Sequence, residues 1–141
     1  PVLGMHNSGL YHADAATGSV STLLPGAAPD GTYNFAQSAQ VGADNQLYFF
    51  FNNLAEIPVQ GHTPLYLVRS APDGVTGRTQ LLPDAFQNLN DVLWAPDASL
   101  AIVLIAPDDG DYIGGEARVV YLDGRASLSL VPYARDPRWG P

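Results

Sequence analysis

Carboxylates form the densest group of chemically capable side chains in this sequence of 141 residues. Asp108, Asp109 and Asp111 stand around a glycine, with Glu116 nearby. Calcium takes several carboxylate and carbonyl oxygens, and a glycine lets a loop close round such an ion. The spacing differs from the Asp-x-Asp-x-Asp-Gly order of an EF-hand. We therefore predict a solvated hairpin loop and no cofactor, with calcium at the three aspartates as the alternative.

Other catalytic and metal-binding patterns are missing from the sequence. Its three histidines are His6, His12 and His62, and it has no cysteine. If Ser8-Gly9 forms a two-residue hairpin loop, His6 and His12 point to opposite faces of a sheet and cannot share a metal ion. There is no Gly-x-Ser-x-Gly elbow and no glycine-rich phosphate loop before a helix. These patterns predict a protein that is neither an enzyme nor a metal binder.

Composition and charge exclude further classes. The formal net charge of −8 argues against a nucleic-acid partner, which requires a basic surface. The longest apolar run, at 100–106, is far too short to span a membrane. Twelve prolines and fourteen glycines indicate many short strands joined by turns. The expected class is therefore all-β.

The stretch 89–106 organises the chain. It predicts a strand, a turn at Ala95-Pro96-Asp97-Ala98 and a second, unbroken apolar strand. An earlier copy at 40–51 places Asp44 where Asp97 stands and Leu47 where Leu100 stands, and a third copy begins at Arg138-Trp139-Gly140-Pro141. We predict strands over 1–6, 10–13, 20–24, 33–41, 47–51, 65–68, 78–82, 89–94, 100–106, 117–122, 128–131 and 137–139.

The order of these strands repeats. Tyr11, Tyr66 and Tyr121 are 55 residues apart, and each is expected to open the same kind of strand. The apolar runs 47–51 and 100–106 do not alternate with polar residues, which is typical of strands covered on both faces. A long repeat of four strands indicates the blades of a β-propeller. We predict strands b, c and d of a first blade, two full blades and strand a of a further blade, about three blades within 1–141.

Two motifs carry a family resemblance. Trp94-Ala95-Pro96-Asp97 and Val120-Tyr121-Leu122-Asp123-Gly124 resemble the repeat of TolB-like propellers, a WD40-like PD40 repeat with W-S-P-D-G-x-x-I-A-F and I-Y-x-x-D-x-x-G. Ala98 departs from the usual glycine. The resemblance implies a bacterial, exported protein, periplasmic or extracellular, that acts as a non-catalytic protein-interaction or scaffold module. Related repeats also occur in prolyl-oligopeptidase-type serine peptidases, so the propeller portion of a larger enzyme is the alternative.

Candidate binding residues lie in two places. Asn34, Gln37, Asn90 and Asp91 fall on or just before the innermost strands, which line the channel of a propeller. The long loops at 52–63 and 107–116 carry Glu56 and the three aspartates named above, on one face. Function usually lies on loops held by a rigid scaffold, and acidic loops favour a basic protein partner. We expect Trp94 and Trp139 to pack rather than to bind.

Three blades leave two sheet faces uncovered, which is an aggregation hazard. We therefore predict that something completes the arc. A second copy would close a six-bladed ring as a homodimer, with the strand at Trp139 completing the partner's first blade; such a half-propeller could bind a small ligand in its channel. Alternatively, a protein partner or the rest of a longer polypeptide completes a larger propeller.

Overall fold

The computed structural model describes residues 9–57, 63–107 and 114–140, and these ranges form β-strands, turns and loops. The strands are β1 (Leu10–Ala13), β2 (Val20–Leu24), β3 (Tyr33–Val41), β4 (Leu47–Leu54), β5 (Leu65–Ser70), β6 (Thr79–Phe86), β7 (Leu89–Trp94), β8 (Leu100–Ile105), β9 (Gly114–Tyr121) and β10 (Leu128–Arg135). The all-β prediction is confirmed. No helix that could cross a membrane occurs in the described ranges.

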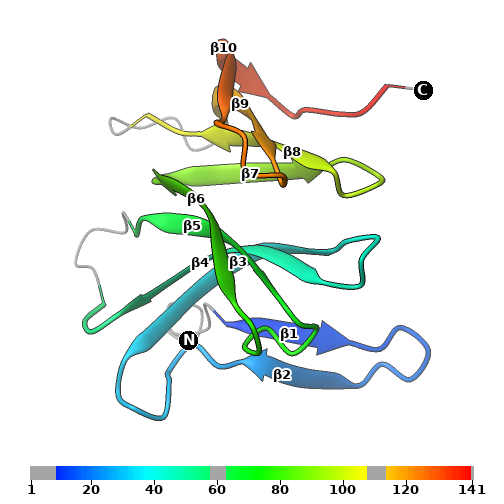
Figure 1. The fold of residues 1–141 in the computed structure, drawn as a ribbon, viewed down its shortest axis with the longest axis vertical. Coiled ribbons are helices and arrows are strands. Elements are labelled where there is room, and N and C mark those ends of the chain that lie inside the picture. The colour runs from blue at the N-terminus through cyan, green and yellow to red at the C-terminus, as the bar shows by residue number, and fades with distance from the viewer. Residues whose placement is uncertain (1–8, 58–62, 108–113, 141) are drawn as a thin grey trace.

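The strands form three antiparallel sheets. Sheet 1 pairs β1 with β2, sheet 2 has the order β3-β4-β5-β6, and sheet 3 has the order β7-β8-β9-β10. Neighbours in sequence are neighbours in space, so sheets 2 and 3 are four-stranded meanders. The sheets lie one above another, with sheet 2 between the other two (Figure 1). This arrangement confirms the prediction of four-stranded units.

Strand β4 is covered on both faces, as its unbroken apolar run predicts. All five residues from Leu47 to Phe51 are buried. Phe49 and Phe51 belong to a core shared with β1 and β2 of sheet 1. Phe50, between them, points the other way into a core shared with Val103 and Val120 of sheet 3. Alternation of side chains along the strand therefore joins all three sheets.

The hairpins β3–β4 and β7–β8 have similar turns. The N–H of Gly42 donates to Gln46 O at 2.9 Å, and the N–H of Ala95 donates to Leu100 O at 2.9 Å. Asn45 and Ala98 adopt left-handed backbone conformations, with φ of 59° and 55°. The predicted equivalence of Asp44 and Asp97 therefore holds.

Leu47 and Leu100 each begin the second strand of their sheet, as predicted, but the registers of their hairpins differ by one residue. Val41 pairs with Leu47, whereas Trp94 pairs with Ala101, because the second turn is one residue longer. Val41 and Trp94 themselves occupy the same position. Each is the last residue of the first strand in its sheet.

The outer strands run past the ends predicted at residues 82 and 131. Both β6 and β10 have eight residues, and the fifth of each is a proline, Pro83 or Pro132. The ladder shifts register near both prolines. Proline lacks the N–H that a central strand requires but is tolerated at a sheet edge, and both strands are edges.

Two further expectations need correction. Tyr121 ends β9, whereas Tyr11 and Tyr66 each stand second in their strands, so the spacing of 55 residues is not a structural repeat. Residues 137–139 do not form a strand, because no other described strand pairs with them. The strand predicted at 1–6 lies outside the described residues.

Candidate functional site

Asn34 is buried in β3, and its side-chain amide and backbone N–H all form hydrogen bonds within the protein. Its Nδ2 donates to Pro25 O at 2.9 Å, and its Oδ1 accepts a bond from Asn53 Nδ2 at 2.8 Å. Its backbone N–H donates to Gly26 O at 2.7 Å. These bonds fasten the loop before β3 to the first strand of sheet 2. Asn34 therefore positions the inner strand and offers a ligand little.

The other predicted channel residues also contact the backbone. Gln37 Nε2 donates to Leu89 O at 3.3 Å, which links β3 to β7. Asn90 Nδ2 donates to Gly114 O at 3.3 Å. Asp91 is exposed, and its Oδ1 accepts the N–H of Val92 at 2.9 Å. The structure thus places Gln37, Asn90 and Asp91 on the first strands of sheets 2 and 3, and Gln37 and Asn90 also hold neighbouring segments.

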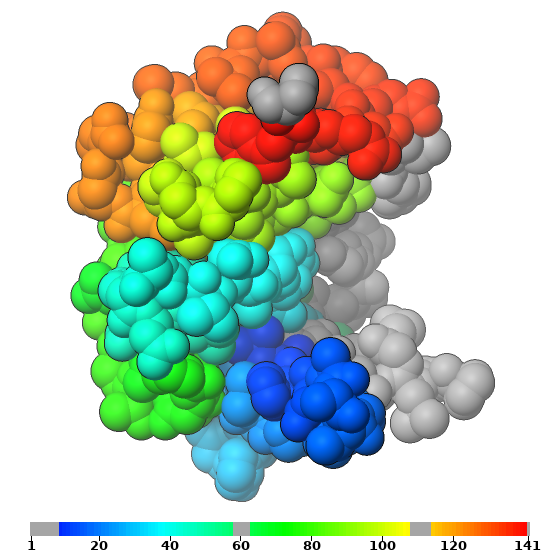
Figure 2. Space-filling view, turned by 90° about the vertical axis from the view of Figure 1, so that its right-hand side faces the viewer, coloured from blue at the N-terminus to red at the C-terminus, as the bar shows by residue number. Residues whose placement is uncertain are grey.

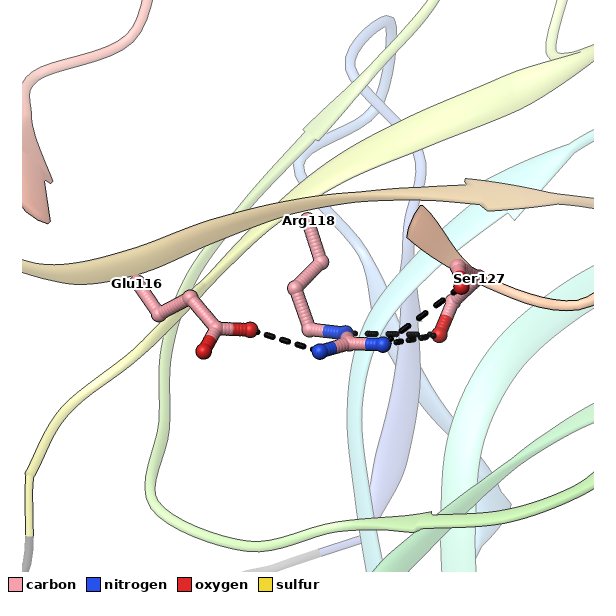
Figure 3. A network of polar contacts seen from close by, with 3 residues as sticks. All are labelled: Glu116, Arg118 and Ser127. Atoms are coloured by element: carbon pink, nitrogen blue, oxygen red, sulfur yellow. Dashed lines mark hydrogen bonds and ion pairs between the residues drawn. The ribbon is translucent and has the colours of Figure 1, made fainter. Parts of the chain in front are cut away.

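The predicted acidic loop face is described only in part. Asp108, Asp109 and Asp111, with the calcium alternative, lie outside the described residues. Glu56 is exposed after β4. Glu116 lies in β9 and accepts a bond from Arg118 Nη1 at 2.7 Å (Figure 3).

The Arg118 side chain is the centre of a small polar network (Figure 3). Its Nη2 and Nε donate to the Oγ of buried Ser127 at 3.0 and 3.3 Å. The network joins β9 to the residue before β10. Glu116 is therefore part of a structural ion pair rather than a free acid of the loop face.

A second acidic surface lies where sheets 2 and 3 meet. Asp44, Asp97, Asp123 and Arg125 line a groove of about 400 Å³ beside the turns. Arg125 Nε donates to Asp123 Oδ2 at 2.8 Å, and its guanidinium lies 4.0 Å from the centre of the Tyr121 ring. Within the described parts of the chain, no three histidine, aspartate or glutamate side chains gather as metal ligands.

The aspartates of this groove belong to a larger set of turn aspartates. Each accepts the backbone N–H of the residue two positions later, an Asx-turn that holds the local chain in shape. The six turn aspartates are Asp14, Asp30, Asp44, Asp73, Asp97 and Asp123.

These hydrogen bonds lower the pKa of all six carboxyl groups below the usual value. The Ser99 hydroxyl is the main cause for the pKa of Asp97, and the Tyr48 hydroxyl for that of Asp44. The backbone N–H of Arg125 is the main cause for the pKa of Asp123. Turn formation therefore accounts for six of the twelve aspartates in the sequence.

Stability is expected to fall in acid because of these turns. A folded-state pKa below the unfolded value of about 3.9 gives stability that is complete above that value. It is lost as pH falls through the lowered pKa values. We expect the wild-type Tm to drop below about pH 4, more steeply than in a D73N/D97N variant, whose amides keep the acceptor but do not titrate. Thermal unfolding by circular dichroism from pH 7 to pH 2 checks this; parallel curves would contradict it.

Apolar side chains of β10 are exposed at the edge of sheet 3. Leu82 and Val131 are each the fourth residue of an eight-residue outer strand. Leu82 is 2% exposed because sheet 3 covers it, whereas Val131 is 43% exposed. Leu128, Leu130 and Tyr133 of β10 are about half exposed as well. The strand position that is buried on β6 is therefore exposed on β10.

Both tryptophans donate the indole N–H to a backbone carbonyl of an inner strand. Trp94 Nε1 donates to Ser38 O of β3 at 2.9 Å, and its ring packs near Phe50. Trp139 Nε1 donates to Trp94 O at 2.7 Å, although the residue follows sheet 3. The segment at 137–140 thus lies against the end of β7. Packing was predicted for both residues, and these contacts agree.

The sequence predicted uncovered sheet faces but did not single out the exposed apolar residues of β10. The available signal was the likeness of Leu82-Pro83 to Val131-Pro132, which occupy the same strand position in different surroundings. Comparison with protein-family models, curated proteins and solved structures finds no match to this chain.

Proposed function

We propose that this chain is a TolB-like propeller segment that acts as a non-catalytic protein-interaction or scaffold module, with the exposed apolar residues of β10 as its binding surface. The difference between Leu82 and Val131 carries the proposal. The same strand position is sealed by the next sheet in one case and exposed to water in the other. Burial of apolar surface is the main driving force for association, so this face favours a partner.

The partner that fits best is another sheet of the same kind. Sheets 1 and 2 and sheets 2 and 3 already pack face to face through apolar cores. A further sheet would meet β10 as sheet 3 meets β6. A second copy of the chain supplies such a sheet and would close a propeller ring. Two described sheets of four strands, each followed by the next, support this arrangement.

Light scattering after size-exclusion chromatography tests the proposal. We expect the wild-type chain to show twice its mass of 15.0 kDa. We expect V131D to show the mass of one chain, because a carboxylate would be buried in the contact. The control is V75D, since Val75 is 51% exposed in the β5–β6 connection, away from β10. A monomeric wild-type chain would exclude the second copy as partner, and a dimeric V131D would exclude this face.

A further inference from the structure

An apolar cavity lies between sheet 1 and the β3–β4 hairpin. Its volume is about 320 Å³, and described side chains line it, including Leu10, Leu23, Val41 and Leu47. His12 and Gln46 add polar groups to the lining. Figure 2 views the side of the molecule on which the β3–β4 turn, in cyan, lies over the β1–β2 hairpin, in blue. The volume is at the lower end of the range for small-molecule sites.

The interface between sheets 2 and 3 shows which side chain the fold can hold at the position equivalent to Val41. Val41 ends β3 as Trp94 ends β7, and each precedes the same kind of turn. Trp94 directs its indole toward sheet 2, where it packs against the core and donates to Ser38 O. Val41 instead lines the cavity against β1 of sheet 1 and is 54% exposed. The cavity therefore accompanies the smaller side chain.

Trp139 gives the same comparison a second time. In the sequence it stands before Gly140-Pro141 as Trp94 stands before Ala95-Pro96, and its indole also donates to a carbonyl of the preceding inner strand. Two of the three equivalent sequence positions therefore carry an indole that donates to a carbonyl of the preceding inner strand. Only the position of Val41 lacks it.

We propose that the cavity beside Val41 binds a small, neutral, planar aromatic molecule of indole size. The lining is mostly apolar, so a charged ligand would lose its hydration without compensation. The Gln46 amide and the His12 imidazole can orient a ring N–H or hydroxyl group. The site lies between sheets 1 and 2 and so does not depend on what covers sheet 3. The test of this site is therefore independent of the test of the proposed function.

Fluorine NMR with 5-fluoroindole tests the site. We expect saturable binding to the wild-type chain with a Kd of about 0.1–1 mM, the range for a ligand of so few atoms. V41W should weaken binding at least about tenfold, because the new indole fills the cavity. A126W places the same side chain in the exposed β9–β10 turn, outside the cavity lining, and should bind as the wild type does. V41F serves as a second, smaller plug at the same position if V41W does not fold.

Three results would overturn the proposal. One is the absence of saturable binding to the wild-type chain. Another is unchanged binding by a folded V41W or V41F variant. The third is binding of a tryptophan-containing peptide without binding of free 5-fluoroindole, which would assign the cavity to the side chain of a partner protein.

Discussion

Replacing Phe50 by alanine is expected to lower the free energy of unfolding by about 3–5 kcal/mol. Phe50 is fully buried between sheets 2 and 3. Its ring meets Phe86 edge-on with centroids 5.5 Å apart, and the Trp94 ring lies 6.2 Å away. Alanine would lose these contacts and leave a cavity that strands paired on both sides cannot close. Equilibrium unfolding in urea measures the change.

The size of this effect tests whether sheets 2 and 3 share one core. Domains are stable by about 5–15 kcal/mol, so F50A should remove a large fraction of the total. V75A is the control, because Val75 is exposed and truncation there should cost no more than about 0.5 kcal/mol. A loss below about 1 kcal/mol for F50A would contradict a shared core.

Gly115→Ala is expected to destabilise the protein by at least about 2 kcal/mol, through steric overlap rather than lost flexibility. A Cβ at Gly115 would lie 2.1 Å from Ile105 O and 2.4 Å from Ile105 C. Both atoms belong to the backbone of β8, which pairs with β9 along its whole length. The overlap can be relieved only by separating these two strands.

Gly140 provides the matched control for this substitution. A Cβ there would meet nothing within 4 Å, so G140A should unfold at the wild-type temperature. Thermal unfolding of the two variants side by side compares the same added methyl group in two surroundings. Equal Tm values for G115A and G140A would show that β8 and β9 are not packed as closely as described.

Local patterns predicted much of the fold correctly. The hairpin of β7 and β8 was expected at 89–94 and 100–106, and it forms at Leu89–Trp94 and Leu100–Ile105. Its turn residues and apolar run are enough to define it, because they act within a few neighbouring residues. The unbroken run in β4 likewise predicted a strand covered on both faces.

What depends on distant neighbours could not be predicted. Residues 137–139 have strand-like composition, but a strand forms only where another strand pairs with it. Val131-Pro132 resembles Leu82-Pro83 in sequence. Only the arrangement of the sheets makes Val131 exposed and Leu82 buried. Asn34, a predicted channel residue, fastens the loop before β3 and bonds across the sheet to Asn53. These bonds could not be predicted because neither has a local sequence signal.

The two tryptophans also provide intrinsic fluorescence probes of the protein. Trp94 is half-buried at the boundary of sheets 2 and 3, and Trp139 is 43% exposed beyond sheet 3. Fluorescence emission of indole shifts to shorter wavelength in apolar surroundings, so the two residues emit differently in one molecule. Separation of sheets 2 and 3 changes the first signal, and release of the 137–140 segment from β7 changes the second. Both changes can be observed without an added label.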